Sequence, residues 1–142
     1  MTIQAGLSAT AADQLQIHNA SGYLRLATAA TLTLASDIIV PTQNYNKVAV
    51  QSSTTDTCLS ITGTNVTDGF VLILVPNNTA HTITFTDTAT PAAGTLSLAG
   101  DFSMTGVGAT LTLIYTGTDW LELARTPGMT AGKVIAITTV FA

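Results

Sequence analysis

The chain has 142 residues, of which 46% are hydrophobic and only 8% are charged, against about 25% charged residues in typical soluble domains. A formal net charge of −4, with four lysines and arginines spread along the sequence, excludes a nucleic-acid binder, which needs clustered cations. The length fits one domain with a buried core, and the absence of any run of 18 apolar residues excludes a membrane-spanning helix.

Threonine supplies much of the polarity of this sequence. The chain contains 28 threonines but only one glutamate, Glu122, and two lysines. Threonine is β-branched and favours pleated, half-exposed strands, whereas the usual surface helix formers are scarce, so a helical bundle or coiled coil is not expected. The N-terminus lacks the basic and apolar segments of a secretory signal, and the single cysteine, Cys58, can form no internal disulfide.

Residues 1–14 are weakly patterned and predict an extended N-terminal arm. Residues 15–142 predict a single β domain, because apolar and polar residues alternate there with a period of two, as in antiparallel strands with one buried face. The alternating apolar pairs, in chain order, are Leu15 and Ile17, Leu24 and Leu26, Leu32 and Leu34, Val48 and Val50, Leu59 and Ile61, Ile83 and Phe85, Leu96 and Leu98, Leu111 and Leu113, and Leu121 and Leu123. We therefore predict an all-β fold, an antiparallel β-sandwich or barrel of many short strands.

Two apolar segments depart from this alternation. Phe70–Val75 is apolar without a break and predicts a central strand, buried on both faces or lying in a subunit interface. Lys133–Phe141 is apolar and β-branched, and predicts either a final core strand or a strand given to a neighbouring subunit. Turn residues separate the strands, including Thr67–Gly69 and Thr116–Asp119, and no strict repeat of 20–50 residues is present.

The residues that usually carry chemistry are few and scattered. His18 and His81 fall at strand ends beside turns, and Cys58 is expected to fill space in a sheet. The aspartates lie mostly in turn-like segments, where their side chains cap backbone donors. No zinc-type spacing, calcium loop, phosphate-binding glycine loop or nucleophile motif is present, so we predict no enzyme, metal site or cofactor.

One segment carries a resemblance to a known group of proteins. Gly94–Thr126 contains Leu-x-Leu-x-Gly-x-Phe and then Thr-Leu-Thr-Leu-Ile-Tyr-x-Gly-x-x-Trp-x-Glu-x-x-Arg. Upstream, Ile39–Tyr45 looks like an opening strand and turn, and Asp68–Leu74 with Thr82–Asp87 looks like the strand pair G-x-x-L-x-L and T-I-x-F-x-D. Together these segments resemble virion proteins of tailed bacteriophages, namely capsid-decoration proteins and domains of tail appendages.

The resemblance implies a structural role on the surface of a virus particle. A capsid-decoration (cement) protein of this kind binds the major capsid protein of the assembled head, commonly as a homotrimer, and stabilises the head by mass action. The alternative is a tail fibre, spike or appendage domain that presents receptor-binding loops. A third alternative, a small β-barrel enzyme or a carbohydrate- or ligand-binding module, would need a cluster of aromatic or polar groups, and the chain has only one tryptophan, three tyrosines and four phenylalanines.

The candidate anchors of the core or of an interface are Trp120, Tyr115, Arg125 and Phe102. The strands on either side of Thr116–Asp119 have apolar residues on both faces, which suits a molecule that packs against another layer or subunit. In a regular strand Glu122 and Arg125 point to opposite faces, whereas a bulge between them would bring them together.

Overall fold

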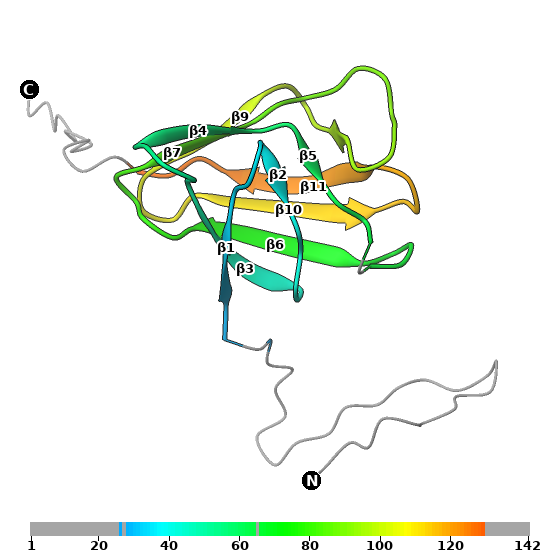
Figure 1. Ribbon diagram of the computed structural model, residues 1–142, viewed down its shortest axis with the longest axis horizontal. Coiled ribbons are helices and arrows are strands. Elements are labelled where there is room, and N and C mark those ends of the chain that lie inside the picture. The colour runs from blue at the N-terminus through cyan, green and yellow to red at the C-terminus, as the bar shows by residue number, and fades with distance from the viewer. Residues whose placement is uncertain (1–25, 27, 65, 130–142) are drawn as a thin grey trace, which may run out of the picture.

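The computed structural model describes residues 26, 28–64 and 66–129, and these residues form eleven β-strands and no helix (Figure 1). Within the same ranges there is accordingly no helix long and apolar enough to cross a membrane. In chain order the strands are β1 (Ala30–Thr33), β2 (Ile38–Ile39), β3 (Tyr45–Ala49), β4 (Thr55–Cys58), β5 (Ser60–Ile61), β6 (Val71–Pro76), β7 (Thr82–Phe85), β8 (Leu96–Ser97), β9 (Phe102–Met104), β10 (Thr110–Tyr115) and β11 (Trp120–Thr126). For these residues the prediction of an all-β fold is confirmed.

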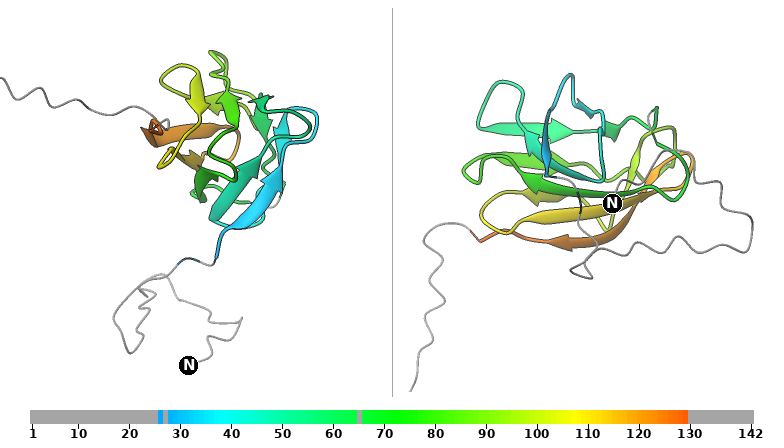
Figure 2. Two further views of the ribbon diagram at one scale, coloured as in Figure 1. Left: turned by 90° about the vertical axis from the view of Figure 1, so that its left-hand side faces the viewer. Right: turned by 90° about the horizontal axis from the view of Figure 1, so that it is seen from below.

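The strands form three sheets. A six-stranded sheet has the order β1-β3-β6-β10-β11-β8, a three-stranded sheet has the order β4-β7-β9, and β2 pairs with β5. The first strands of each sheet are parallel, because the chain winds in successive coils. Each coil places its strands beside those of the coil before, in the same direction. Thus β1, β3 and β6 stack on one side, β4 and β7 on a second, and β2 and β5 on a third. This arrangement resembles the stacked coils of a β-solenoid, and Figure 2 (right) shows the coils following one another in chain order.

Among the described strands, antiparallel pairs appear only for the last ones, where β9 and β10 run opposite to β7 and β6. In turn, β11 runs back along β10. β8 adds a short parallel pairing at the start of β11. This antiparallel end is built by the segment that carries the sequence resemblance.

The core lies inside the coils. In β6 and β10 the alternation is simple, since Leu72, Leu74, Leu111 and Leu113 face inward and are fully buried. The three-stranded sheet contributes the second wall of the core, and β2 and β5 contribute one isoleucine each. The residues from these other walls are Cys58, Ile83, Phe85, Phe102, Met104, Ile39 and Ile61. The predicted central strand is therefore present as β6, with one face fully buried and the other half-buried.

Pairing direction is the main correction to the predicted fold. Antiparallel strands were expected throughout, but five of the eight strand pairs in the described ranges are parallel. The alternation of apolar residues fixes which side chains face the core, and this pattern is the same for both directions of a neighbouring strand. The stack of coils is consequently not a clear sandwich or barrel.

Two of the alternating pairs do not face the core as predicted. Leu59 is exposed although Ile61 is buried, because the chain turns a corner between β4 and β5 and breaks the alternation there. Leu121 and Leu123 are also exposed, since β11 buries the face of Trp120 instead. Leu26 is also exposed, while its predicted partner Leu24 lies outside the described residues. The predicted arm 1–14, the pair Leu15 and Ile17, His18 and the segment Lys133–Phe141 lie outside them as well.

Candidate functional site

Trp120 occupies the middle of an aromatic cluster beside the turn between β10 and β11. Its exposed fraction is 0%, and its indole Nε1 donates a hydrogen bond of 2.8 Å to the carbonyl oxygen of Ile61. The ring of Phe70 lies edge-on to it, with centroids 6.3 Å apart, and the ring of Tyr115 lies tilted at 5.0 Å. Edge-on and tilted contacts of this kind are the favourable arrangements for aromatic rings. Trp120 therefore joins β11 to β5 through its hydrogen bond and to Phe70 and Tyr115 through packing.

The turn Thr116–Asp119 sets this geometry. Thr116 donates its backbone N–H to the carbonyl of Asp119 at 2.9 Å, and Gly117 takes the positive φ of 87° that the turn needs. As a result Tyr115 and Trp120 are direct cross-strand partners. The Asp119 carboxylate accepts hydrogen bonds from the hydroxyls of Thr116 and Ser97, and these bonds lower its pKa below the usual value.

Arg125, Phe102 and Glu122 form a second cluster at the other end of β11. The Arg125 guanidinium donates to both carboxylate oxygens of Glu122 and to the carbonyl oxygens of Gly100 and Asp101, and it lies 5.1 Å from the centroid of the Phe102 ring. The pKa of Glu122 is lowered, first by the hydrogen bond from Arg125, and that of Arg125 is raised by the same contact. A register shift between Thr112 and Leu113 marks the bulge that makes this pairing possible.

The four predicted anchors thus separate into two groups. Trp120 and Tyr115 belong to the aromatic cluster, and Arg125 and Phe102 belong to the ion-pair cluster. Trp120 and Phe102 are buried in this chain, whereas Tyr115 and Arg125 are half-exposed. Among the four, only Tyr115 also reaches the surface depression described next.

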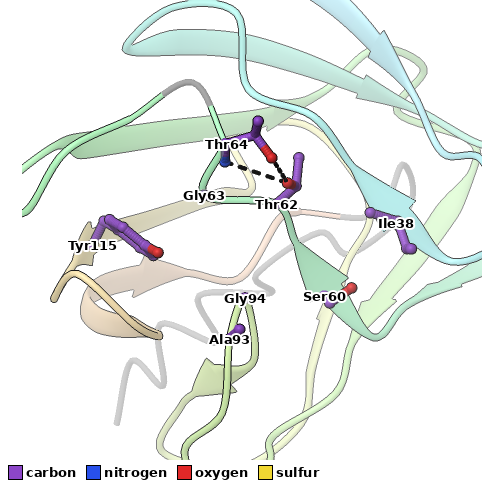
Figure 3. A pocket seen from close by; sticks show the side chains of 8 residues that line it. All are labelled: Ile38, Ser60, Thr62, Gly63, Thr64, Ala93, Gly94 and Tyr115. Atoms are coloured by element: carbon purple, nitrogen blue, oxygen red, sulfur yellow. Dashed lines mark hydrogen bonds between the residues drawn. The ribbon is translucent and has the colours of Figure 1, made fainter.

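A hollow of about 390 Å³ lies beside the aromatic cluster, on the side of the stack formed by β2 and β5 (Figure 3). Its walls come from three successive coils and from β10. The lining residues are Ile38, Ser60, Thr62, Gly63, Thr64, Ala93, Gly94 and Tyr115. None of them carries a charge at neutral pH, and four of them carry hydroxyl groups.

Two glycines allow the walls of the hollow to approach one another. A Cβ at Gly63 would lie 2.3 Å from the Tyr115 hydroxyl oxygen, so only glycine lets the loop pass this ring. Gly94 has a φ of 76°, and a Cβ there would lie 2.7 Å from the carbonyl oxygen of Ile61. Gly94 also accepts a hydrogen bond of 2.8 Å from the backbone N–H of Ile61, which ties the floor to β5. The hollow is therefore held by backbone contacts.

The amino-acid sequence alone does not indicate this hollow. Ser60, Thr62 and Thr64 look like any other residues in a chain with 28 threonines, and Gly63 and Gly94 look like ordinary turn glycines. Only the stacking of coils brings residues 38, 60–64 and 93–94 next to Tyr115. The only local indication in the sequence is the spacing of Ser60, Thr62 and Thr64, because residues two apart in an extended strand point to the same face.

The remaining ionisable side chains are dispersed. Among the residues that the structure describes, no three histidine, cysteine or acidic side chains lie together in a way that could hold a metal ion. Cys58 is fully buried, and burial raises the pKa of its thiol to about 12. His81 lies in the turn before β7, where its Nε2 is 3.2 Å from Nδ2 of Asn78.

The outward face of the six-stranded sheet carries a row of apolar side chains, flanked by threonines of β1, β10 and β11. Cross-strand register aligns Tyr45 with Ile73, and aligns Val71 with Ile114 and Leu121. We use the name "outer face" for Tyr45, Val71, Ile73, Val75, Ile114 and Leu121. Lys47 is the charged residue at the outward positions of β1, β3, β6, β10 and β11. Leu121 is 46% exposed, and the other five residues are half-buried.

Comparison with known proteins adds no relationship to these observations. No family model, no curated protein and no solved structure matches the chain.

Proposed function

We propose that the protein is a structural component of a tailed-bacteriophage virion, a capsid-decoration protein that binds the assembled head as a homotrimer. The observation that carries the proposal is the outer face, a row of Val, Ile, Leu and Tyr side chains on a sheet with one charged residue among its outward positions. A contiguous group of apolar side chains on the surface of a small domain is typical of a protein–protein contact. In this proposal the outer face is the contact between subunits.

The other described parts of the molecule are consistent with this role. Glu122 and Asp119 are both held by hydrogen bonds within the fold, and Cys58 is buried with a raised pKa. The segment Gly94–Thr126, which resembles phage virion proteins, builds the antiparallel end of the stack and contributes Ile114 and Leu121 to the outer face. A subunit of this kind would stabilise a capsid by binding only its assembled form.

The first experiment is the native mass of the full chain in solution, measured by light scattering and native mass spectrometry. We expect a trimer, and we expect Leu121→Lys to dissociate it because a lysine ammonium is costly to bury in an apolar contact. Leu59→Lys is the matched control, since Leu59 is 48% exposed, against 46% for Leu121, but lies outside the outer face. A native monomer, or equal effects of the two variants, would contradict the outer face as the subunit contact.

The second experiment tests the virion. Empty heads of the virus that encodes the chain, prepared without this protein, should bind the purified trimer and melt at a higher temperature after binding. Heads that have not yet expanded should bind it weakly, because the proposed site is completed only in the assembled, expanded shell. Absence of binding to expanded heads would contradict capsid decoration even if the protein is a trimer.

The parallel stacking favours one second candidate, a domain of a tail appendage. Coils that each contact only their neighbours can be extended along one axis, as elongated fibres and spikes require. A labelled form of the chain that binds host cells and leaves expanded heads unoccupied would favour this candidate.

A further inference from the structure

We propose that the hollow beside Tyr115 is a binding site for one sugar unit of an uncharged saccharide. The proposal rests on the lining of the hollow and does not depend on the virion role. Its volume of about 390 Å³ lies at the lower end of the range of about 300–1,000 Å³ that is usual for small-molecule sites. A space of this size accommodates one sugar ring and excludes a folded protein segment.

The chemistry of the lining favours a neutral, hydroxyl-rich ligand. No Asp, Glu, Lys, Arg or His lines the hollow, so a charged ligand would lose hydration there without gaining a charged partner. A purely apolar ligand would instead cover the hydroxyls of Ser60 and Tyr115 without replacing their bonds to water, which is also costly. Sugar hydroxyls both donate and accept hydrogen bonds, as serine, threonine and tyrosine hydroxyls do, and therefore match this lining.

Two of the four hydroxyl groups in the lining form no hydrogen bond with another lining residue. Among the eight lining residues the hydrogen bonds join only Thr62 and Thr64, whose hydroxyl oxygens are 2.7 Å apart (Figure 3). Ser60 and Tyr115 have no partner among the lining residues, and they approach the hollow from different sides. Ile38 and Ala93 add small apolar surfaces against which the carbon–hydrogen faces of a sugar ring can rest.

Backbone hydrogen bonds hold the walls of the hollow in place. They connect Ile61 to Gly94, Gly94 to Thr118 and Thr62 to Ile39, at 2.8, 2.8 and 2.9 Å. Because these bonds fix the walls before binding, little conformational entropy is lost when a ligand enters.

Trp120 provides an internal reporter of this hollow. It is the only tryptophan of the chain, it is 5.0 Å from the ring of Tyr115, and it donates a hydrogen bond to Ile61, between Ser60 and Thr62. A ligand that contacts Tyr115 should therefore change the tryptophan fluorescence without touching Trp120 itself.

The test is a fluorescence titration of the full chain with neutral sugars, repeated by calorimetry. The probes are glucose, galactose, mannose, N-acetylglucosamine, lactose and maltose. We expect at least one to give a saturable change in the millimolar range. Tyr115→Phe and Ser60→Ala should each weaken that binding about fivefold to tenfold, as the loss of one hydrogen bond predicts. Ala93→Leu, which fills the hollow from its exposed rim, should abolish it.

The matched control removes two hydroxyls elsewhere. Thr84 and Ser103 are cross-strand partners on the surface of the three-stranded sheet, with hydroxyl oxygens 3.1 Å apart. The double variant Thr84→Ala and Ser103→Ala should bind the sugar as the unmodified chain does. The proposal is overturned if no neutral sugar gives a saturable change, or if the control weakens binding as much as Tyr115→Phe and Ser60→Ala do.

Discussion

Glu122 and Arg125 are three residues apart on β11 and nevertheless lie on the same side of the sheet. The register shift opposite Leu113 places Leu123 in a bulge, so Glu122 and Arg125 come to the buried face together. There the guanidinium holds the carboxylate and reaches the carbonyl oxygens of Gly100 and Asp101. One extra residue in the strand thereby ties β11 to the connection between β8 and β9.

This pairing predicts a stability that depends on pH. The pKa of Glu122 is lowered in the folded state, so its contribution is present above the unfolded value of about 4.3 and is lost as the pH falls through the lower folded value. We expect Glu122→Gln to reduce the free energy of unfolding by about 1–3 kcal/mol at pH 7, and to flatten its decline in acid. Urea denaturation between pH 7 and pH 3 measures both effects.

The control for this prediction is Asp68→Asn, which removes the same charge from an exposed turn. Its effect at pH 7 should be within about 0.5 kcal/mol of zero. Equal losses from the two variants would show that net charge, rather than the bond to Arg125, sets the stability.

Trp120 should be the most sensitive single position of the core. Trp120→Ala removes the largest buried side chain and is expected to cost about 3–5 kcal/mol. Trp120→Phe keeps a ring but leaves the carbonyl of Ile61 without its donor, at a cost of about 1–3 kcal/mol. Urea denaturation followed by circular dichroism measures both. An unchanged unfolding midpoint for Trp120→Ala would contradict the central position of this ring.

Gly117 should be required for backbone reasons alone. Its φ is 87°, and a Cβ there would meet Asp68 at 3.7 Å, which is an ordinary contact. Gly117→Ala is therefore expected to cost about 1–2 kcal/mol through the left-handed conformation rather than through a clash. Thr118→Ala in the same exposed turn is the comparison and should be nearly neutral. Denaturant midpoints of the two variants test the difference.

The thiol of Cys58 should be unreactive in the folded protein. A thiol whose pKa rises from 9.0 to about 12 has a thiolate fraction at pH 8 that is about a thousandfold lower, and burial blocks the reagent as well. We expect a colorimetric disulfide reagent to react slowly with native protein and rapidly in guanidinium chloride. Fast reaction of the native chain would mean that β4 opens readily from the stack.

The sequence by itself determined the local content of the fold. The alternation at Leu32 and Leu34, Ile83 and Phe85, and Leu111 and Leu113 identified residues that the core buries, and Thr116–Asp119 identified the turn before Trp120. These features depend on neighbouring residues, because side-chain period and turn conformation are properties of a short stretch of backbone. The all-β class followed from them.

Only the tertiary structure decided how the strands meet. Parallel stacking, the corner that exposes Leu59, the bulge at Leu123 and the hollow beside Tyr115 all depend on contacts between distant segments. A strand with inward apolar residues satisfies the core equally well beside a parallel or an antiparallel neighbour, so its own sequence does not specify the partner. The path of the connections makes that choice, and with it the chain brings Ser60, Gly94 and Tyr115 around one hollow.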